Sequence, residues 1–391
     1  MRFKSLITLL LIFPLLMEAQ SVIGEWDSYT SVLNVRDVLA IDNSIVAASG
    51  GGLVEFDRSA QQFNIYTIRY GLTRNDIQCL AEDKFGRLWL GMGSPDGEIN
   101  IWNSQTKTVE EVFNSFEFGD ELTSIVSIVF TGNKAFAAYR HNVDWGIAYF
   151  KIIDGEYRYQ DRLEAFPMGV SGINSLQVIN DTLWLAATTG LLYANLAQTD
   201  LKPESAWQIV NLPESGNVSR VISYAGKSLF NLDNKIYEIR DGQSYPYNEN
   251  QPKSISDLIL DNAGELYAVT SSGIDRFTSG TWTTMVTVAA TKCSFDSDNI
   301  LWGGSQTSCL WSELHSEAHY LIPNTILDNV YTALYVNEDG SLMAGTQKGF
   351  SLLTDDGWYN IRGLPTTDPA IGGYKDRDWS RFVADNIAYS L

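Results

Sequence analysis

The residues best suited to binding a metal ion or catalysing a reaction are scattered along this sequence. His315 and His319 are four residues apart, a spacing that would place two metal ligands on one side of a helix. They lie between predicted strands, and no His-Glu-x-x-His pattern accompanies them. We therefore interpret this segment as a solvated loop and predict no metal site there.

Acidic turns recur, and their carboxylates are the next candidates for chemistry. Asp83 precedes Gly86 and Asp261 precedes Gly264 by three residues, while Asp339 directly precedes Gly340. Such carboxylates can bind cations, but Asp and Gly also form tight turns for conformational reasons. Because the turn returns about once per repeat, we interpret these residues as structural and predict neither metal nor cofactor.

Aromatic side chains offer a second kind of site, a platform for sugars. The sequence contains 11 Trp, of which Trp89, Trp184 and Trp302 occupy the same position in a repeat. A repeated position predicts a core residue, as does the turn-and-Trp pattern of Asp83, Gly86 and Trp89. Trp145 and Trp379 lie outside this register, so they are the aromatics that we consider candidates for facing a ligand.

No recognisable catalytic motif is present in the sequence. It has no Gly-rich phosphate loop and no nucleophile elbow, and the 47 acidic residues give no single pair prominence as acid and base. We predict a protein that is not an enzyme. The formal net charge of −20 argues against binding to nucleic acid or adsorption to an anionic membrane.

The elements that carry these residues are short strands arranged in repeats. Eight copies of a middle strand follow one another at steps of 35 to 48 residues; they begin at Ile45, Leu88, Ala135, Leu183, Ser228, Leu266, Leu301 and Leu342. A period near forty with four strands per unit is typical of a β-propeller. We therefore predict an all-β fold, a propeller of four-stranded antiparallel blades, over residues 22–361.

The number of blades is open between seven and eight. Glu25 to Tyr29 has the alternation of an outer strand, and it could complete the blade around Leu342 to give eight. Alternatively, the ring closes at seven and the eighth copy opens another domain.

Both ends of the sequence have a different character. Residues 1–20 combine Arg2 and Lys4 with an apolar stretch and Ala19, as a secretory signal peptide does, so we expect export to the periplasm or cell surface. No other stretch is apolar enough to span a membrane. Residues 362–391 read as a linker followed by the start of a further, truncated β domain, and we expect a longer protein.

Three cysteines are an odd number for an exported protein. Cys79 lies in an alternating apolar run. Cys293 and Cys309 fall on the first and third strands of one repeat, about 9–10 Å apart across the intervening strand. Disulfides need closer Cα atoms, so we predict three free, mostly buried thiols.

Two families resemble this chain. Residues 71–91 resemble the two-component-regulator propeller repeat, in which a Gly-Leu pair and an Asn-Asp-Ile-like strand lead into Glu-Asp-x-x-Gly-x-Leu-Trp-Leu-Gly. Residues 22–115 resemble the N-terminal propeller of PorZ-type proteins, through Trp26–Tyr29, Ala47–Asp57 and Tyr66–Leu72. The stretch from Ser294 to Trp302 also loosely resembles the Asp-box turn of sialidase-type propellers, with Asn299 at the position of a Gly; that turn is structural.

These resemblances imply different functions. The PorZ-type family works with type IX secretion at the cell surface, which implies an exported module that binds a protein or a cell-surface glycan. The regulator repeats form the periplasmic sensor propellers of hybrid two-component receptors, which is the alternative. A propeller glycan hydrolase or lyase is a more distant alternative. The sequence does not define an oligomeric state.

Overall fold

The computed structural model describes residues 28–198, 200–248, 250–314, 317–337 and 341–362, together with strands at 383–384 and 387–388. Within these ranges the chain is almost entirely β-structure, interrupted by one helix, α2 (Ser115–Phe118), and by short 3-10 turns at Ile68–Tyr70 and Glu204–Ala206. The predicted signal peptide, His315, Gly340 and Trp379 lie outside the described residues.

Eight four-stranded antiparallel sheets follow one another, and each is a simple meander of consecutive strands. Blades 1 to 4 consist of β1 (Val35–Ile41), β2 (Ser44–Ser49), β3 (Gly52–Asp57), β4 (Gln62–Tyr66); β5 (Ile77–Glu82), β6 (Leu88–Met92), β7 (Ile99–Asn103), β8 (Thr108–Phe113); β9 (Ser124–Thr131), β10 (Lys134–His141), β11 (Asp144–Ile153), β12 (Glu156–Leu163); β13 (Ile173–Ile179), β14 (Thr182–Ala187), β15 (Gly190–Asn195) and β16 (Trp207–Ile209).

The remaining blades repeat the same plan. They consist of β17 (Val218–Tyr224), β18 (Lys227–Leu232), β19 (Lys235–Arg240), β20 (Gln243–Pro246); β21 (Ile255–Leu260), β22 (Leu266–Thr270), β23 (Ile274–Thr278), β24 (Thr281–Val286); β25 (Cys293–Phe295), β26 (Leu301–Gly304), β27 (Leu310–Leu314), β28 (Glu317–Leu321); β29 (Tyr331–Val336), β30 (Leu342–Thr346), β31 (Gly349–Thr354) and β32 (Gly357–Ile361). A two-stranded pair, β33 (Val383–Ala384) and β34 (Ile387–Ala388), follows. The predicted all-β propeller of four-stranded blades is confirmed.

The core lies between blades rather than within one sheet. Trp89 in blade 2 is fully buried and packs against Phe130 and Phe150 of blade 3, with ring centroids 5.1 and 5.2 Å apart. Trp302 in blade 7 lies against Phe56 of blade 1, at 5.8 Å. Each sheet therefore hides its apolar faces against its neighbours, as a stack of blades must.

Small residues in the middle strands leave room for these rings. A Cβ on Gly303 would lie 2.2 Å from the indole of Trp311, which is completely buried. The glycine is required for this close approach rather than for its backbone freedom, and it lets a bulky ring fill the space between blades 6 and 7.

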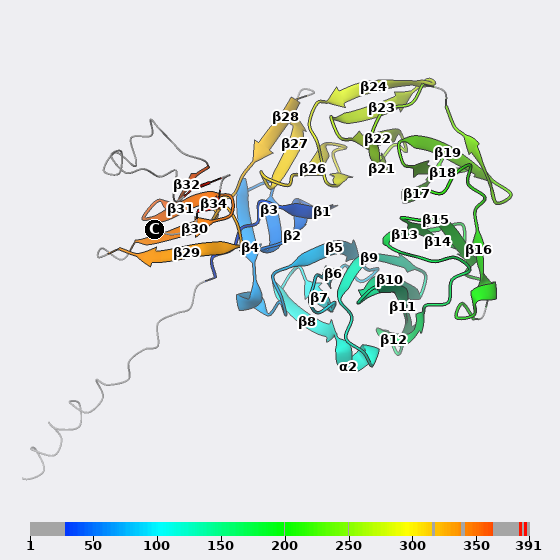
Figure 1. Ribbon diagram of the computed structural model, residues 1–391, viewed down its shortest axis with the longest axis horizontal. Coiled ribbons are helices and arrows are strands. Elements are labelled where there is room, and N and C mark those ends of the chain that lie inside the picture. Colours follow the sequence, from blue (N-terminus) through cyan, green and yellow to red (C-terminus); the bar gives the residue numbers. More distant parts are fainter. Residues whose placement is uncertain are drawn as a thin grey trace, which may run out of the picture.

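Seven blades form a continuous ring, and the eighth lies beside it (Figure 1). The inner strand β1 contacts β5 on one side and β25 and β26 on the other, so blade 7 packs directly on blade 1. The eighth sheet meets the ring through the N-terminal segment: Tyr29 and Trp358 rings lie edge to face at 5.3 Å, and Asn329 Nδ2 donates to Ser31 O at 2.8 Å.

Closure does not use the strand expected from the sequence. Residues 28–34 form no strand, and the blade around Leu342 is completed by its own strand β32. The expectation that Glu25 to Tyr29 would complete that blade is therefore wrong for the part that is described, Ser28 and Tyr29, whereas residues 25–27 lie outside it. The segment joins the two sheets by side-chain and backbone contacts instead.

Arg58 clamps blade 1 to blade 7. Its Nη1 donates to Asp296 Oδ2 at 2.6 Å and to Asp298 Oδ2 at 2.9 Å, and the Asp296 side chain is completely buried. Because no peptide bond joins these two blades directly, such side-chain links carry the closure together with apolar packing.

We expect Arg58→Met to lower the free energy of unfolding by about 3 kcal/mol, because it leaves the buried Asp296 carboxylate without its cation. Urea denaturation measures the loss. The matched control is Arg276→Met, whose pair with Glu265 is 37% exposed on both sides and whose loss should cost about 0.5 kcal/mol or less. Equal stability of Arg58→Met and the control would contradict a closing role for Arg58.

The three cysteines are free and buried, as predicted. Burial raises the pKa of all three thiols, and that of Cys309 reaches about 12. A buried, protonated thiol reacts slowly with disulfide reagents.

We expect no rapid reaction of the three cysteines with Ellman's reagent in the folded protein and reaction of all three thiols after unfolding in guanidinium chloride. Rapid reaction of a thiol in the folded chain would contradict this arrangement.

Candidate functional site

The first strand of each ring blade lines the axis of the propeller. Neighbouring inner strands contact one another around the ring, as in the pairs β1–β5, β5–β9, β9–β13, β13–β17 and β17–β21. Six of these strands carry a β-bulge near their start; the register shifts occur at Val35/Asp37, Ile77/Cys79, Ile125/Ser127, Ile173/Ser175, Val218/Val221 and Ile255/Asp257. A bulge re-aims the side chain that follows it.

The re-aimed side chains connect successive blades. We call the seven inter-blade links the axial belt; they are Leu80 N to Asp37 Oδ2 (2.9 Å), Cys79 Sγ to Ile125 O (3.7 Å), Leu176 N to Ser127 Oγ (3.0 Å), Ser175 Oγ to Ser219 O (2.7 Å), Arg220 Nε beside Asp257 Oδ1 (3.4 Å), Lys292 Nζ to Asp257 Oδ2 (2.7 Å) and Ala40 N to Ser294 Oγ (3.2 Å). Together they link every blade of the ring to the next.

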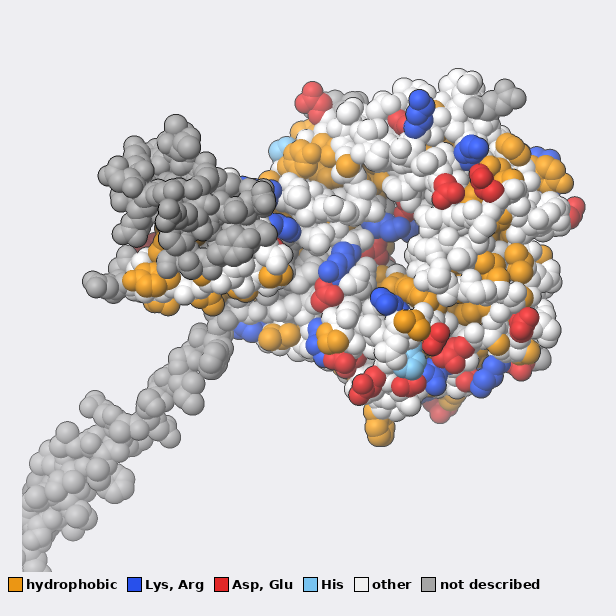
Figure 2. All heavy atoms as spheres, in the orientation of Figure 1, with side chains coloured by type: hydrophobic (Ala, Val, Ile, Leu, Met, Phe, Trp, Pro, Cys, Tyr) orange, Lys and Arg blue, Asp and Glu red, His pale blue; other side chains and the backbone are white. Residues whose placement is uncertain are grey.

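Charge is concentrated in one half of the axial belt. Asp257 is only 1% exposed and lies between Arg220 and Lys292. Burial works to raise the pKa of Asp257, but the two cations and the N–H of Leu258 outweigh it and hold the pKa below its ordinary value. At Asp37, burial prevails over Lys292, the N–H of Leu80 and Arg220, and the pKa is raised. Figure 2 shows Lys and Arg side chains beside the hollow at the centre of the ring.

A pocket of about 390 Å³ opens at this charged half of the channel. Its walls come from the inner strands β13, β17, β21 and β25, and they include Gln177, Arg220, Ile222, Leu258 and Phe295. The pocket thus combines one guanidinium group, amide and hydroxyl groups and apolar walls, which is the composition of a site for a small molecule.

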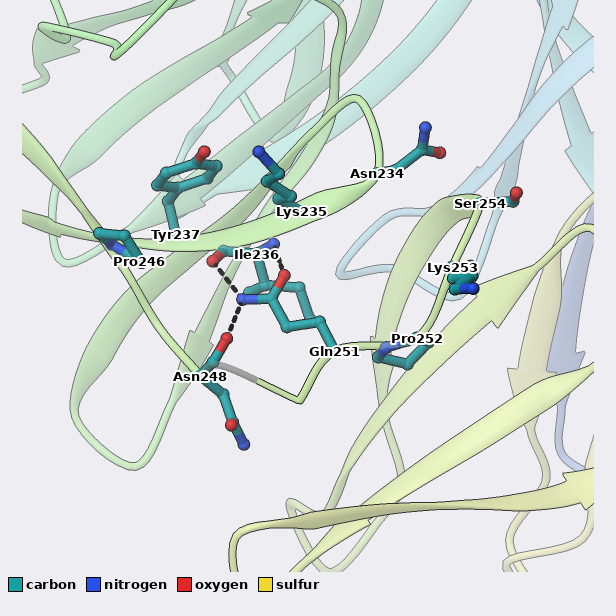
Figure 3. A pocket seen from close by; sticks show the side chains of 10 residues that line it. All are labelled: Asn234, Lys235, Ile236, Tyr237, Pro246, Asn248, Gln251, Pro252, Lys253 and Ser254. Carbon is teal, nitrogen blue, oxygen red and sulfur yellow. Dashed lines mark hydrogen bonds between the residues drawn. The ribbon is translucent and has the colours of Figure 1, made fainter.

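A second hollow, a groove of about 640 Å³, lies where blade 5 leads into blade 6 (Figure 3). The side chain of Gln251 lies across its floor: Nε2 donates to the carbonyl oxygens of Ile236 and Asn248 at 3.0 and 2.6 Å, and Oε1 accepts from Ile236 N at 2.6 Å. Gln251 therefore ties its loop to the start of β19, and both N–H groups of its amide are already used.

The acidic turns have a common geometry. Asp83 Oδ1 accepts from the N–H groups of Phe85 and Arg87 at 2.9 and 3.1 Å, and Oδ2 accepts from Trp89 Nε1 at 3.1 Å. The same links recur at Asp261, from Ala263, Glu265 and Tyr267, and at Asp296 of the Asp-box-like stretch, from Asp298, Ile300 and Trp302. The third predicted turn, Asp339-Gly340, lies outside the described residues. A carboxylate that ties its turn to the core ring six residues later has little capacity left for a cation.

The backbone conformation of the residue three positions after the aspartate explains the glycines in these turns. Gly86 and Gly264 have φ of 74° and 79°, and Asn299 has φ of 61° at the equivalent place in blade 7. Glycine adopts this left-handed conformation without cost and asparagine tolerates it better than most residues. The structure thus accounts for Asn299 at a position where the sequence pattern calls for Gly.

The structure also places two other candidates from the sequence, Trp145 and His319, and neither lies where the sequence pattern predicted. Trp145 lies at the start of β11, half-buried, and packs against the apolar cluster between blades 3 and 4. His319 lies on β28 with its side chain exposed, so the loop expected around it is a strand. Among the described residues there is no group of three or more His, Cys, Asp or Glu side chains that could hold a metal ion. Within the same ranges no helix is long and apolar enough to cross a membrane.

Sequence reasoning missed the axial belt and the pocket beside it. The bulged positions carry Asp, Cys and Ser in different blades, so no repeated residue marks them. The available signal was the presence of Asp37 and Asp257 in predominantly apolar strands, since charged residues are rarely buried without a partner.

We expect Asp257→Asn to destabilise the protein by about 3 kcal/mol at pH 7, because two cations lose their buried partner. Since the folded-state pKa of Asp257 is depressed, its contribution is present above the ordinary pKa and is lost as the pH falls through the folded value. The difference between wild type and variant should therefore shrink below pH 4, as measured by urea denaturation at several pH values. The exposed Asp144→Asn is the control, and a difference independent of pH would contradict the assignment.

Comparisons with known proteins agree with this geometry. A family model described as "Two component regulator propeller" matches residues 71–94. No curated protein sequence matches the chain. Among solved structures, PorZ of Porphyromonas gingivalis, described as an essential bacterial surface component of the type-IX secretion system, is similar with a TM-score of 0.65 and 15% identity over 87% of this chain and 46% of that one.

Two other structures are similar in fold. The extracellular domain of the putative one component system BT4673 from B. thetaiotaomicron has a TM-score of 0.56 and 16% identity, over 88% of this chain and 48% of that one. The WD40 propeller domain of Doa1 has a TM-score of 0.55 and 12% identity, over 71% of this chain and 93% of that one. The chain thus spans about half the length of PorZ and of the BT4673 domain. It is a β-propeller that contains a two-component-regulator propeller repeat and resembles PorZ in fold.

Proposed function

We propose that this chain is a non-catalytic, exported binding module for a protein or a cell-surface glycan, acting as a PorZ-like component of type IX secretion. The observation that carries the proposal is the similarity to PorZ over most of the chain, since that protein is described as an essential surface component of this secretion system. The signal-like residues 1–20 support export.

The arrangement of acidic groups supports a role without catalysis. The carboxylates of Asp83, Asp261 and Asp296 are occupied by turn and core hydrogen bonds. A Tyr-Glu-Arg group exists in blade 3, where Tyr139 donates to Glu164 and Arg162 lies 3.8 Å from the same carboxylate. Tyr139 is only 1% exposed, and burial together with Glu164 raises its pKa, the opposite of what an attacking phenolate requires.

We also propose that the eighth sheet belongs to a separate unit from the ring. Blade 7 packs on blade 1, so β29 to β32 is not needed for closure. This would place a domain boundary between β28 and β29 instead of near residue 362. The pair β33 and β34 lies against this sheet, since β34 contacts β29, β30 and β31.

The alternative is a periplasmic sensor propeller of a two-component receptor. The regulator repeat at residues 71–94 and the fold of the BT4673 extracellular domain favour it. A hydrolase or lyase is less well supported, because the carboxylates of the acidic turns are already hydrogen-bonded and Tyr139 is buried.

Deleting the gene in its native host tests the main proposal. We expect type IX cargo to be retained inside the cell and an epitope-tagged copy of the protein to be recovered in the cell envelope, and complementation with the wild-type gene should restore secretion. Normal cargo secretion combined with an altered transcriptional response to glycans would overturn it in favour of the sensor.

A glycan panel tests the absence of catalysis. We expect the purified chain to bind without releasing products, as measured by surface binding and by chromatography of the same glycans after prolonged incubation. Product release that is abolished by Glu164→Gln, but not by the exposed control Asp144→Asn, would show that the protein is an enzyme.

A further inference from the structure

The pocket in the charged half of the axial channel holds an arginine whose hydrogen-bonding capacity is unused. Arg220 Nε is buried without a hydrogen-bond acceptor, and within the described ranges its guanidinium donates no hydrogen bond. The nearest carboxylate oxygen, Asp257 Oδ1, lies 3.4 Å away, while the other oxygen of Asp257 accepts from Lys292 at 2.7 Å. A buried donor left in this state costs about 1–3 kcal/mol, so it calls for a partner.

The pocket presents other free groups beside Arg220. Gln177 is half-buried and Ser223 is exposed, and neither side chain has a hydrogen-bond partner among the residues that the structure describes. Ile222, Leu258 and Phe295 provide apolar walls on the same pocket. Directional polar groups together with hydrocarbon walls suit a ligand with a polar head and an apolar body.

The surrounding charges narrow the choice of polar head. Arg220 and Lys292 contribute two positive charges, and Asp37 and Asp257 contribute carboxyl groups close to them. The two carboxyl groups offset most or all of this positive charge, which disfavours a dianion such as phosphate. A planar monoanion matches the fork of the guanidinium, because two parallel N–H donors face two oxygens.

We propose that the axial pocket binds a small organic carboxylate, whose carboxylate group pairs with Arg220 while its hydrocarbon part lies against Ile222, Leu258 and Phe295. Gln177 and Ser223 donate hydrogen bonds at the same end of the ligand. This site is independent of the protein- or glycan-binding role proposed above and would remain if that role proved wrong.

Isothermal titration calorimetry with the purified chain tests the site. Hexanoate and benzoate are the probes, and hexanamide and benzamide are neutral controls of the same shape; inorganic phosphate tests for a general anion site. We expect one carboxylate per chain, with the amides and phosphate at least about tenfold weaker, a difference in line with the loss of one charge-assisted pair.

Three variants locate the binding. Arg220→Gln should weaken the carboxylates by about tenfold or more, and Ser223→Trp should block the mouth of the pocket while leaving every charge in place. Arg276→Gln changes an arginine that does not line the pocket and whose side chain is 37% exposed, and this variant should bind like wild type. Thermal melting identifies any variant that fails to fold. If Arg220→Gln does not fold, the affinity of Ser223→Trp still tests the site.

The proposal is overturned by any of four results: no heat from either carboxylate at millimolar concentration, equal affinity for acid and amide, tighter binding of phosphate, or unchanged affinity in a folded Ser223→Trp.

Discussion

A ring of sheets has no covalent bond to close it, and this constraint governs the rest of the structure. Blade 1 and blade 7 are separated by almost the whole ring in sequence, yet they must pack as tightly as consecutive blades do. In this protein closure rests on apolar packing around Phe56 and Trp302, on the Arg58 clamp and on the contact of Ala40 N with Ser294 Oγ. Because no strand is exchanged between the ends of the ring within residues 28–362 as far as they are described, side chains provide the specificity that main-chain pairing would otherwise supply.

The axial belt extends the same solution to every blade junction. Where inner strands lie close together, short groups such as Ser127, Ser175 and Cys79 reach the next backbone. The inner strands β21 and β25 contact each other less than the other neighbours do, and there the link is the long side chain of Lys292 on Asp257. Asp257 also pairs with Arg220 at the preceding junction, between β17 and β21. The charged half of the belt and the axial pocket are thus two consequences of one wider junction.

The repeat was predictable from the sequence because its constraints are local. Asp83, Gly86 and Trp89 act within one hairpin, so the same residue types return in later blades and define the period. The choice between closure at seven and at eight blades could not be made from the sequence, and the axial belt was missed. Both depend on pairs such as Arg58 with Asp296 and Asp37 with Leu80, which are far apart in sequence and differ from blade to blade. Trp145 illustrates a limit of reasoning from the repeat. It lies outside the register of the repeat, yet its side chain is half-buried rather than exposed.

The wider junction also connects ligand binding to the stability of the ring. A group that binds the folded chain and not the unfolded one stabilises the folded state in proportion to its occupancy. A carboxylate on Arg220 would supply an acceptor to a donor that the ring leaves unsatisfied, at the junction that relies most on side chains. Any effect of such a ligand on the protein would therefore act through the packing of blades 4 to 7, since these blades share the residues that would hold it.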